Sequence, residues 1–314
     1  VLVEEGLLER RPRQGVFVSA GAARNGRSKL RRVRALFYLE LLTPYYGRMA
    51  EALSRALAEA GVDLVWSTAG EITGDAAFAR RVAGWDEDAF VIVGVQPPPV
   101  MEALAKSGRP LTSVDIVCEG IASDQAVLDN EGVGFEAARR FFEAGHRRIA
   151  WVGACVSADS PLHEADRPAE WPNSLRRAMG VRRAYHERGL PVDERLFRSL
   201  RKSREADALL AEWLAMPERP TAAFCFDTQA ALRLVRTARQ HGLCVPQDLA
   251  VAATGEPGEE WDSEGAALSC FRVNWEALGR EAAKLCLARA EDSAAPYKRV
   301  VLPWTLELGA TAGW

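Results

Sequence analysis

VLDNEGVGFEAARRFFEAGHRRIAWVGA, residues 127–154, is the stretch of sequence that decides the fold. Residues 131–145 carry apolar side chains at the spacing of an amphipathic helix, and either Asp129 or Asn130 precedes them as an N-cap. Residues 146–154 follow as a short apolar run, which is typical of a buried strand. A helix that leads at once into a buried strand is the repeating unit of α/β proteins.

The same alternation continues on both sides of this stretch. Before it, the pattern predicts strands at residues 33–41, 62–68, 89–94 and 109–115, and helices at 45–61, 75–85 and 98–108. After it, the pattern predicts helices at 173–189, 205–216 and 228–242, and strands at 221–226 and 249–254. Short spacing between the elements favours parallel sheets with helices on both faces, so we expect an α/β fold of two doubly wound halves.

Composition limits the class of protein. The chain has 314 residues, of which 48% are hydrophobic and 26% charged, enough for one large or two medium domains. No run approaches the roughly 18 apolar residues of a membrane span, and the N-terminal charges are unlike a signal peptide, so we expect a cytoplasmic protein with no membrane partner. The six cysteines are scattered and form no Cys-x-x-Cys pair, which predicts buried apolar side chains in a reducing compartment and no metal site.

Sequence motifs give little support to an enzyme. The chain contains no phosphate-binding loop, no Gly-x-Gly-x-x-Gly, no nucleophile elbow and no His-Glu-x-x-His. The four histidines form no obvious constellation either. We therefore expect neither catalysis nor a cofactor.

Positive charge is concentrated at the N-terminal end. Residues 1–34 contain nine Lys and Arg against three Glu, a net charge of +6, which leaves −9 on the remaining residues of a chain whose total is −3. Within LLERRPRQGVFVSA, residues 7–20, the pattern predicts a β-hairpin that turns at 12–15 and continues as a strand at 16–18. The basic segment is either a surface that faces a polyanion or a solvated linker.

Two resemblances add to this interpretation. Five stretches of the chain closely resemble effector domains of the lac-repressor and galactose-repressor (LacI/GalR) family. They are residues 127–154, 179–193, 219–254, 273–292 and 298–314. That resemblance implies a two-lobed, periplasmic-binding-protein-like fold over residues 33–314, with three crossings at the hinge. By resemblance, the first lobe takes about 33–150 and 271–294, and the second about 151–270 and 295–314.

The second resemblance concerns the N-terminal end. LVEEGLLERRPRQGVFV, residues 2–18, looks like the end of a winged-helix DNA-binding domain of the GntR type. It covers only about the last third of such a domain, so residues 1–19 are expected to be a remnant and 20–32 a basic linker. The wing residues expected to touch DNA are Arg10, Arg11, Arg13 and Gln14, although this chain alone should bind DNA weakly.

The LacI/GalR resemblance also implies candidate ligand-binding residues. Tyr45 and Tyr46 match a turn after the first strand and are expected at the cleft wall, or else as a core pair. Arg177 matches a family arginine, with Arg176 as the alternative if the register slips by one. Asp115 ends a predicted strand at a position that is often acidic in the family, although it also suits the start of a turn.

Four further candidates lie near loops of the second lobe. Asp227 ends the strand before the helix at 228–242, so it is either a ligand-binding residue or the cap of that helix. Glu256 falls near a family aspartate. Trp171 and Trp261 lie in loops that depart from the family pattern, and each is either a stacking platform for a ligand or a residue packed on its own loop.

The resemblances together imply a ligand-responsive transcriptional regulator, specifically a repressor. Its expected partners are a sugar or sugar-like effector in the interlobe cleft, operator DNA in the full-length protein and a second copy in a homodimer. The alternative is a transport-associated sugar-binding protein of the same fold, which would carry a signal peptide.

Overall fold

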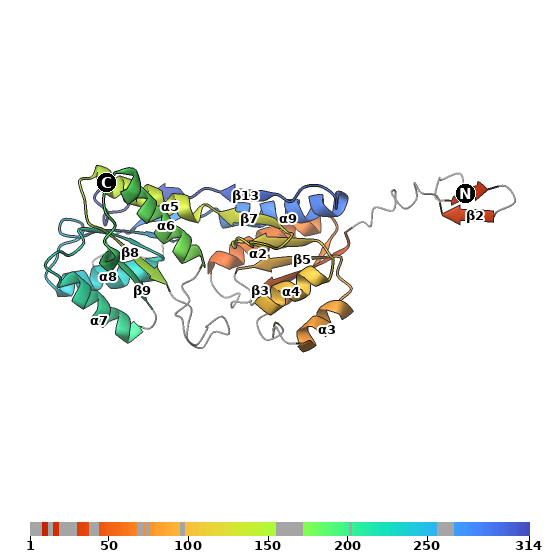
Figure 1. Cartoon of the computed structure of the whole chain (residues 1–314), viewed down its shortest axis with the longest axis horizontal. Helices are drawn as coiled ribbons and strands as arrows, with labels where there is room; N and C mark the ends of the chain where they lie inside the picture. Colours follow the sequence, from red (N-terminus) through yellow and green to blue (C-terminus); the bar gives the residue numbers. More distant parts are fainter. Residues whose placement is uncertain are drawn as a thin grey trace.

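The computed structural model of the chain describes residues 8–11, 15–18, 30–37, 44–67, 72, 76–94, 98–154, 172–200, 203–255 and 267–314. Within these residues, two six-stranded sheets lie side by side along the long axis of the molecule (Figure 1). We call each sheet with its covering helices a lobe. The predicted α/β fold of two doubly wound halves is confirmed.

The first lobe is built on an entirely parallel sheet with the strand order β13-β7-β6-β5-β3-β4. Its strands are β3 (Arg32–Phe37), β4 (Asp63–Ser67), β5 (Ala89–Val93), β6 (Leu111–Val114), β7 (Asp124–Leu128) and β13 (Arg299–Leu302). Alternate residues of β5 enter two different cores, with Val91 and Val93 on one face and Phe90 and Ile92 on the other. This alternation is why a fully buried strand appears in the sequence as a continuous apolar run.

Helices cover both faces of the first sheet. One face packs against α2 (Pro44–Glu59) and α9 (Trp275–Glu291). The other packs against α3 (Ala76–Gly84) and α4 (Pro98–Lys106).

The second lobe repeats this plan with the strand order β14-β12-β11-β10-β8-β9, in which only the β12–β14 pair is antiparallel. Its strands are β8 (Ile149–Ala154), β9 (Phe197–Leu200), β10 (Ala222–Cys225), β11 (Ala250–Thr254), β12 (Ser269–Arg272) and β14 (Thr305–Glu307). The helices are α5 (Asn130–Glu143) and α6 (Pro172–Glu187) on one face, and α7 (Ser203–Leu214) and α8 (Thr228–Gln240) on the other. A short 3-10 helix, η2 (Glu194–Leu196), precedes β9.

In the part of the chain that the structure describes, the backbone crosses between the lobes three times. The crossings run from β7 to α5, from β12 to α9 and from β13 to β14. The first and third lie side by side, because the backbone N–H of Asp129 donates to the carbonyl of Leu302 at 3.0 Å.

These crossings place two segments differently from the lobe bounds expected from the sequence. Helix α5 packs with α6 against the second sheet, so the second lobe begins near residue 129 and not after 150. Strand β13 pairs with β7 in the first sheet, although residues 295–314 were expected to lie in the second lobe. The reason is that the third crossing lies between β13 and β14, after β13 has completed the edge of the first sheet.

The N-terminal hairpin forms a separate two-stranded sheet. Strands β1 (Leu8–Arg11) and β2 (Gly15–Val18) pair antiparallel, with Leu8 opposite Val18 and Arg11 opposite Gly15. The predicted hairpin is thus present.

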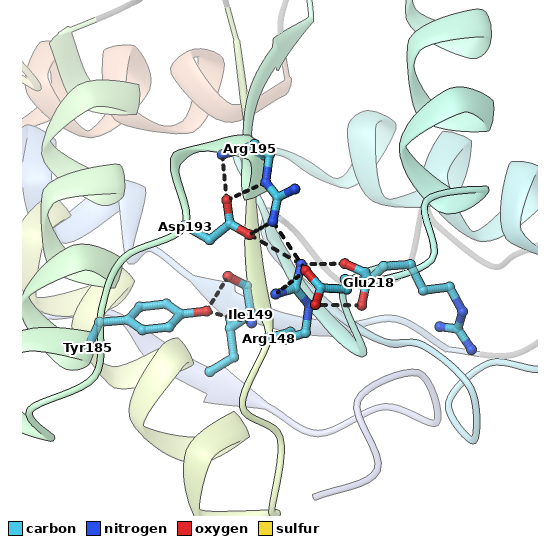
Figure 2. A network of polar contacts seen from close by, with 7 residues as sticks. Arg148, Ile149, Tyr185, Asp193, Arg195 and Glu218 are labelled. Atoms are coloured by element: carbon cyan, nitrogen blue, oxygen red, sulfur yellow. Dashed lines mark hydrogen bonds and ion pairs between the residues drawn. The ribbon is translucent and has the colours of Figure 1, made fainter.

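A polar network fastens the N-terminal ends of strands in the second lobe (Figure 2). Arg195 binds Asp193 through two hydrogen bonds of 2.9 Å and reaches the carboxylate of Glu218 at 3.2 Å. Arg148, just before β8, contacts Asp193 at 3.2 Å and donates to the carbonyl of Glu218. The Arg195 guanidinium lowers the pKa of the Asp193 carboxyl to about 2. Because strands β8 and β10 run away from this network, their carboxyl ends lie at the opposite edge of the sheet.

Cysteine burial agrees only partly with expectation. Among the described cysteines, which are all free thiols, Cys225, Cys270 and Cys286 are buried, whereas Cys244 is exposed. No described helix is both long and apolar enough to span a bilayer.

Candidate functional site

A cavity of about 310 Å³ lies between the lobes, at the carboxyl ends of the strands. Parallel sheets place their ligand sites at this edge, where loops and helix N-termini carry polar groups. Residues from both lobes and from the crossings line the cavity: Tyr46, Gly94, Asp115, Asn173, Arg177, Phe226, Asp227, Thr228, Thr254, Gly255, Val273, Trp275 and Trp304.

Arg177 reaches the cavity because α6 lies very close to α5. A Cβ atom on Gly134 of α5 would overlap the carbonyl oxygen of Arg177, and one on Gly180 would overlap the carbonyl oxygen of Glu131. Only glycine permits two helix backbones to approach so closely at these points. The paired glycines therefore set the position from which the arginine extends.

The guanidinium of Arg177 is held by four neighbours. Its Nε donates to the Oδ1 of Asn130 at 2.8 Å. Its Nη1 donates to the carbonyl of Phe226 at 2.7 Å and to the hydroxyl of Thr254 at 2.5 Å. Its central carbon lies 4.5 Å from the centre of the Phe226 ring and 4.7 Å from that of Trp304, which are cation–π distances.

Arg177 is buried yet remains charged at neutral pH. The residue is only 6% exposed. Burial lowers the pKa of its guanidinium to about 10, although the negative charges of Asp115 and Asp227 act to raise it. None of its hydrogen bonds with described residues uses Nη2. This nitrogen, on a residue that lines the cavity, is thus available to donate to a bound molecule.

Asp115 faces Arg177 from the first lobe. Its carboxylate accepts a hydrogen bond of 2.7 Å from the hydroxyl of Tyr46. Burial raises the pKa of the Asp115 carboxyl to about 6, although Tyr46, Arg177 and Asn173 all act to lower it. Burial also raises the pKa of the Tyr46 hydroxyl.

Asp115 and Asn173 connect the two lobes across the cavity. The side-chain amide of Asn173, in the first turn of α6, donates to the Asp115 carbonyl at 2.9 Å and to its carboxylate at 3.3 Å. The neighbouring Arg176 forms a 3.4 Å ion pair with Glu119 of the first lobe. Two contacts from one helix thus join the lobes, and the one made by Asn173 lies at the cavity.

Aromatic rings form much of the remaining wall. Tyr46 packs edge-on against Phe37 with ring centres 5.0 Å apart, and against Trp275 at 5.3 Å. Trp275 begins α9 at the second crossing. Flat aromatic faces beside hydrogen-bonding groups suit a ring with hydroxyl substituents.

The cavity brings together four of the residues that sequence analysis named. Tyr46, Asp115, Arg177 and Asp227 all line it. Asp227 also caps α8, because its carboxylate accepts from the backbone N–H of Ala230 at 2.7 Å, so the capping interpretation is confirmed and a role in ligand binding stays a prediction.

Several other candidates are not placed by the structure. Trp171, Glu256 and Trp261 lie outside the described residues, as do Arg13 and Gln14. The side chains of Tyr45, Arg10 and Arg11 are likewise not described, although Tyr45 lies in α2 and both arginines lie in β1.

Sequence reasoning missed Asn173, Thr254, Trp275 and Trp304. Asn173 had a usable signal, because it precedes Arg177 by four residues and therefore shares its helix face. Thr254 ends a strand that was predicted correctly. The two tryptophans carried no signal, because nothing local shows that they sit at crossings. Among the described residues, no group of His, Cys, Asp or Glu has the arrangement of a metal site.

Comparisons with known proteins agree with this geometry. The profile of the periplasmic binding protein-like domain family matches residues 138–312. The HTH-type transcriptional regulator DegA of Bacillus subtilis (strain 168) is 26% identical over 222 residues, which are 69% of this chain. The chain spans 62% of the length of that regulator.

Solved structures share the whole two-lobed arrangement. A complex of the transcriptional regulator CelR with cellobiose superposes with a TM-score of 0.69 at 23% identity, covering 90% of this chain and 86% of that one. A regulatory protein of the LacI family from Chloroflexus aggregans superposes with a TM-score of 0.72 at 18% identity, covering 90% and 98%. The chain therefore belongs to the periplasmic binding protein-like domain family and has the fold of LacI-family regulators.

Proposed function

We propose that this chain is the ligand-sensing part of a transcriptional regulator, a repressor that holds a sugar or sugar-like molecule between its lobes. The observation that carries the proposal is the guanidinium of Arg177. It is fixed by Asn130, Phe226 and Thr254, and one nitrogen remains without a described partner at the cavity. A buried, fixed donor of this kind recognises hydroxyl or carboxylate oxygens.

The chemistry of the surrounding wall supports a ring-shaped polar ligand. The Asp115 carboxylate accepts hydrogen bonds from Tyr46 of its own lobe and from Asn173 of the opposite lobe, and Trp275 and Tyr46 supply aromatic faces. The cavity volume is at the small end of the range of about 300–1,000 Å³ for small-molecule sites. A molecule that touches both lobes would bias the protein toward the closed arrangement.

Two comparisons support regulation as the use of this binding. The relative DegA is named as a transcriptional regulator, and the structurally similar CelR is a regulator in complex with cellobiose. We extend the regulatory role, and binding of a sugar-like effector, to this chain by analogy. We also propose a cytoplasmic location for the protein, because a bacterial transcriptional regulator such as DegA meets its operator DNA there.

We further propose that the β1–β2 hairpin is the wing of a GntR-type winged-helix domain. The wing would place Arg10, Arg11, Arg13 and Gln14 at DNA, where arginines contact phosphates or the minor groove. Operators with two-fold symmetry are read by two-fold dimers, so the complete protein would act as a homodimer that associates mainly through the first lobe.

The ligand proposal is tested by calorimetry with a panel of monosaccharides, disaccharides, sugar acids and nucleobases. We expect at least one panel member to bind the folded protein. Arg177→Ala should weaken that binding more than tenfold, because a charge-assisted hydrogen bond contributes about 1.5–3 kcal/mol.

Arg182→Ala is the matched control. Arg182 also lies on α6, but its guanidinium pairs with Glu194 within the second lobe at 2.6 Å and it does not line the cavity. Its removal should change the affinity much less. Equal effects of the two substitutions, or no binder in the panel, would contradict the proposal. Ligand binding without any operator binding by the complete protein would favour the transport-associated alternative.

A further inference from the structure

Trp304 lies on the third crossing, between β13 of the first sheet and β14 of the second. Its ring is partly buried and packs against the core of the first lobe between α2, α9 and the sheet. The same ring packs against the core of the second lobe beneath α5 and α6. Among the described residues, Trp304 is the one side chain that belongs to the packing of both lobes.

Asn130 occupies the neighbouring crossing. It begins α5 directly after the first lobe ends at β7, and it is only 4% exposed. Its side-chain nitrogen donates at 3.4 Å to the carbonyl of Leu128, the last residue of β7. Its side-chain oxygen faces the other way and accepts from Arg177. Asn130 thus joins a strand of the first lobe to a helix of the second.

Both residues converge on the same guanidinium. Asn130 binds the Nε of Arg177 at 2.8 Å, and the Trp304 ring lies 4.7 Å from its central carbon. The remaining hydrogen bonds of Arg177 go to Phe226 and Thr254 within the second lobe.

We infer that Asn130 and Trp304 are positioning residues that make the placement of Arg177 depend on the angle between the lobes. This inference rests on the proposed ligand site. Because α5 packs closely on α6, the backbone of Asn130 stays in place relative to Arg177. A change in that angle instead moves the Leu128 carbonyl, which holds the Asn130 side chain, and moves Trp304 relative to α6. A ligand held by Arg177 therefore favours one lobe angle through Asn130, which does not line the cavity, and through Trp304, which does.

The first experiment measures binding of the panel member that binds the wild-type protein most tightly. Asn130→Leu keeps a similar volume but removes the acceptor, and we expect it to raise the Kd at least tenfold. Asn130→Asp retains an oxygen that accepts from Nε but loses the amide that donates to the Leu128 carbonyl, so its rise in Kd should be smaller than that of Asn130→Leu. Trp304→Ala should also raise the Kd at least tenfold, whereas Trp304→Phe keeps an aromatic face beside the guanidinium and should lose less.

Trp213→Phe controls for general loss of packing. Trp213 is a fully buried tryptophan on α7, in the other core of the second lobe. Its replacement should lower the thermal midpoint and leave the Kd within threefold of the wild type.

The second experiment needs no ligand. We expect Trp304→Ala to increase hydrogen exchange at least fivefold at the amide of Asp129, which bonds to Leu302 across the adjacent crossings. Trp213→Phe should not raise exchange there. Because this measurement uses the ligand-free protein, it separates the hinge role from the proposed function.

The outcomes are distinct. A panel without any binder contradicts the proposed function, and faster exchange confined to Trp304→Ala then still supports the hinge role. A binder whose affinity is unchanged by Asn130→Leu and Trp304→Ala overturns the inference and leaves the proposed function in place. Equal losses for Asn130→Leu and Asn130→Asp also overturn it, because the acceptor would then have no part in the effect.

Discussion

Asp115 has a left-handed backbone conformation, with φ of 60°, directly after β6. Asp and Asn are among the few residues other than glycine that adopt this region readily. The turn points the carboxylate toward Tyr46 and Asn173, where burial raises its pKa. Asp115→Asn keeps the shape and the backbone preference while removing the ionisation, so it isolates the effect of charge.

We predict that Asp115 makes the folded protein less stable as pH rises. The carboxyl ionises at about 6 in the folded protein and near 3.8 when unfolded, so between these values the folded state binds more protons. The free energy of unfolding then falls as pH increases from about 4 to 7, by at most about 3 kcal/mol. Urea unfolding of the wild type and Asp115→Asn over this range measures the difference.

Tyr46→Phe provides the control for this prediction. The Tyr46 hydroxyl lowers the pKa of Asp115 by donating to its charged form, so its removal should move the loss of stability to higher pH. Parallel pH profiles for the wild type and Asp115→Asn would show that Asp115 does not titrate in this range.

At the residue scale, the sequence predicted part of the site for identifiable reasons. Arg177 and Asp115 could be named because family resemblance supplied a register, and the structure places both at the cavity. Trp304 could not be named, because its position depends on β13 and β14 belonging to different sheets. That pairing is set by contacts with β7 and β12, which are distant in the sequence.

At the element scale, α5 and α6 were both predicted from apolar periodicity, but their close contact was not. The contact depends on Gly134 and Gly180, and a glycine within a helix ordinarily indicates only lower helix propensity. That these glycines permit close helix packing becomes clear only once the facing backbone is known. A Cβ on Gly180, for example, would come within 2.6 Å of the Phe135 nitrogen.

We predict that Gly134→Ala lowers stability and weakens ligand binding together. The new methyl group overlaps the carbonyl of Arg177, a backbone atom that cannot rotate away, so the helices must separate. Overpacking of this kind costs about 1–3 kcal/mol, more than the gain in helix propensity of about 1 kcal/mol. Urea unfolding and calorimetry with the tightest panel member measure the two effects.

Gly47→Ala is the matched control on α2. No atom lies within 4 Å of a Cβ at this position, so only helix propensity should change. We expect stability to rise by up to about 1 kcal/mol with no change in affinity. A stabilised Gly134→Ala variant that binds normally would show that the α5–α6 contact does not position Arg177.

At the scale of the whole molecule, alternation of strands and helices was enough to predict two doubly wound halves. Strand order and lobe bounds were harder to predict, because local periodicity does not reveal which lobe a segment joins after the chain crosses between the lobes. Residues 299–302 illustrate this, since their apolar pattern suits either sheet and pairing with β7 decides the matter.

Charge is divided unequally along the chain, with +6 on residues 1–34 and −9 on the rest. If the hairpin is a wing, its arginines contact phosphates, and each such contact releases bound counterions from DNA. In a protein with the complete winged-helix domain, Arg11→Ala and Arg13→Ala should therefore weaken binding similarly for operator and unrelated DNA. Each should also reduce the slope of log affinity against log salt by about 1.

Arg183→Ala is the control for this prediction, because it removes the same charge from the acidic body. Arg183 lies on α6 and pairs with Glu187, so its loss changes the net charge without removing a proposed DNA contact. Anisotropy titrations at several salt concentrations give the slopes. If net charge alone attracts the DNA, all three variants should reduce the slope equally. If the hairpin is the wing, only Arg11→Ala and Arg13→Ala should do so, because counterion release requires a charge placed directly at a phosphate.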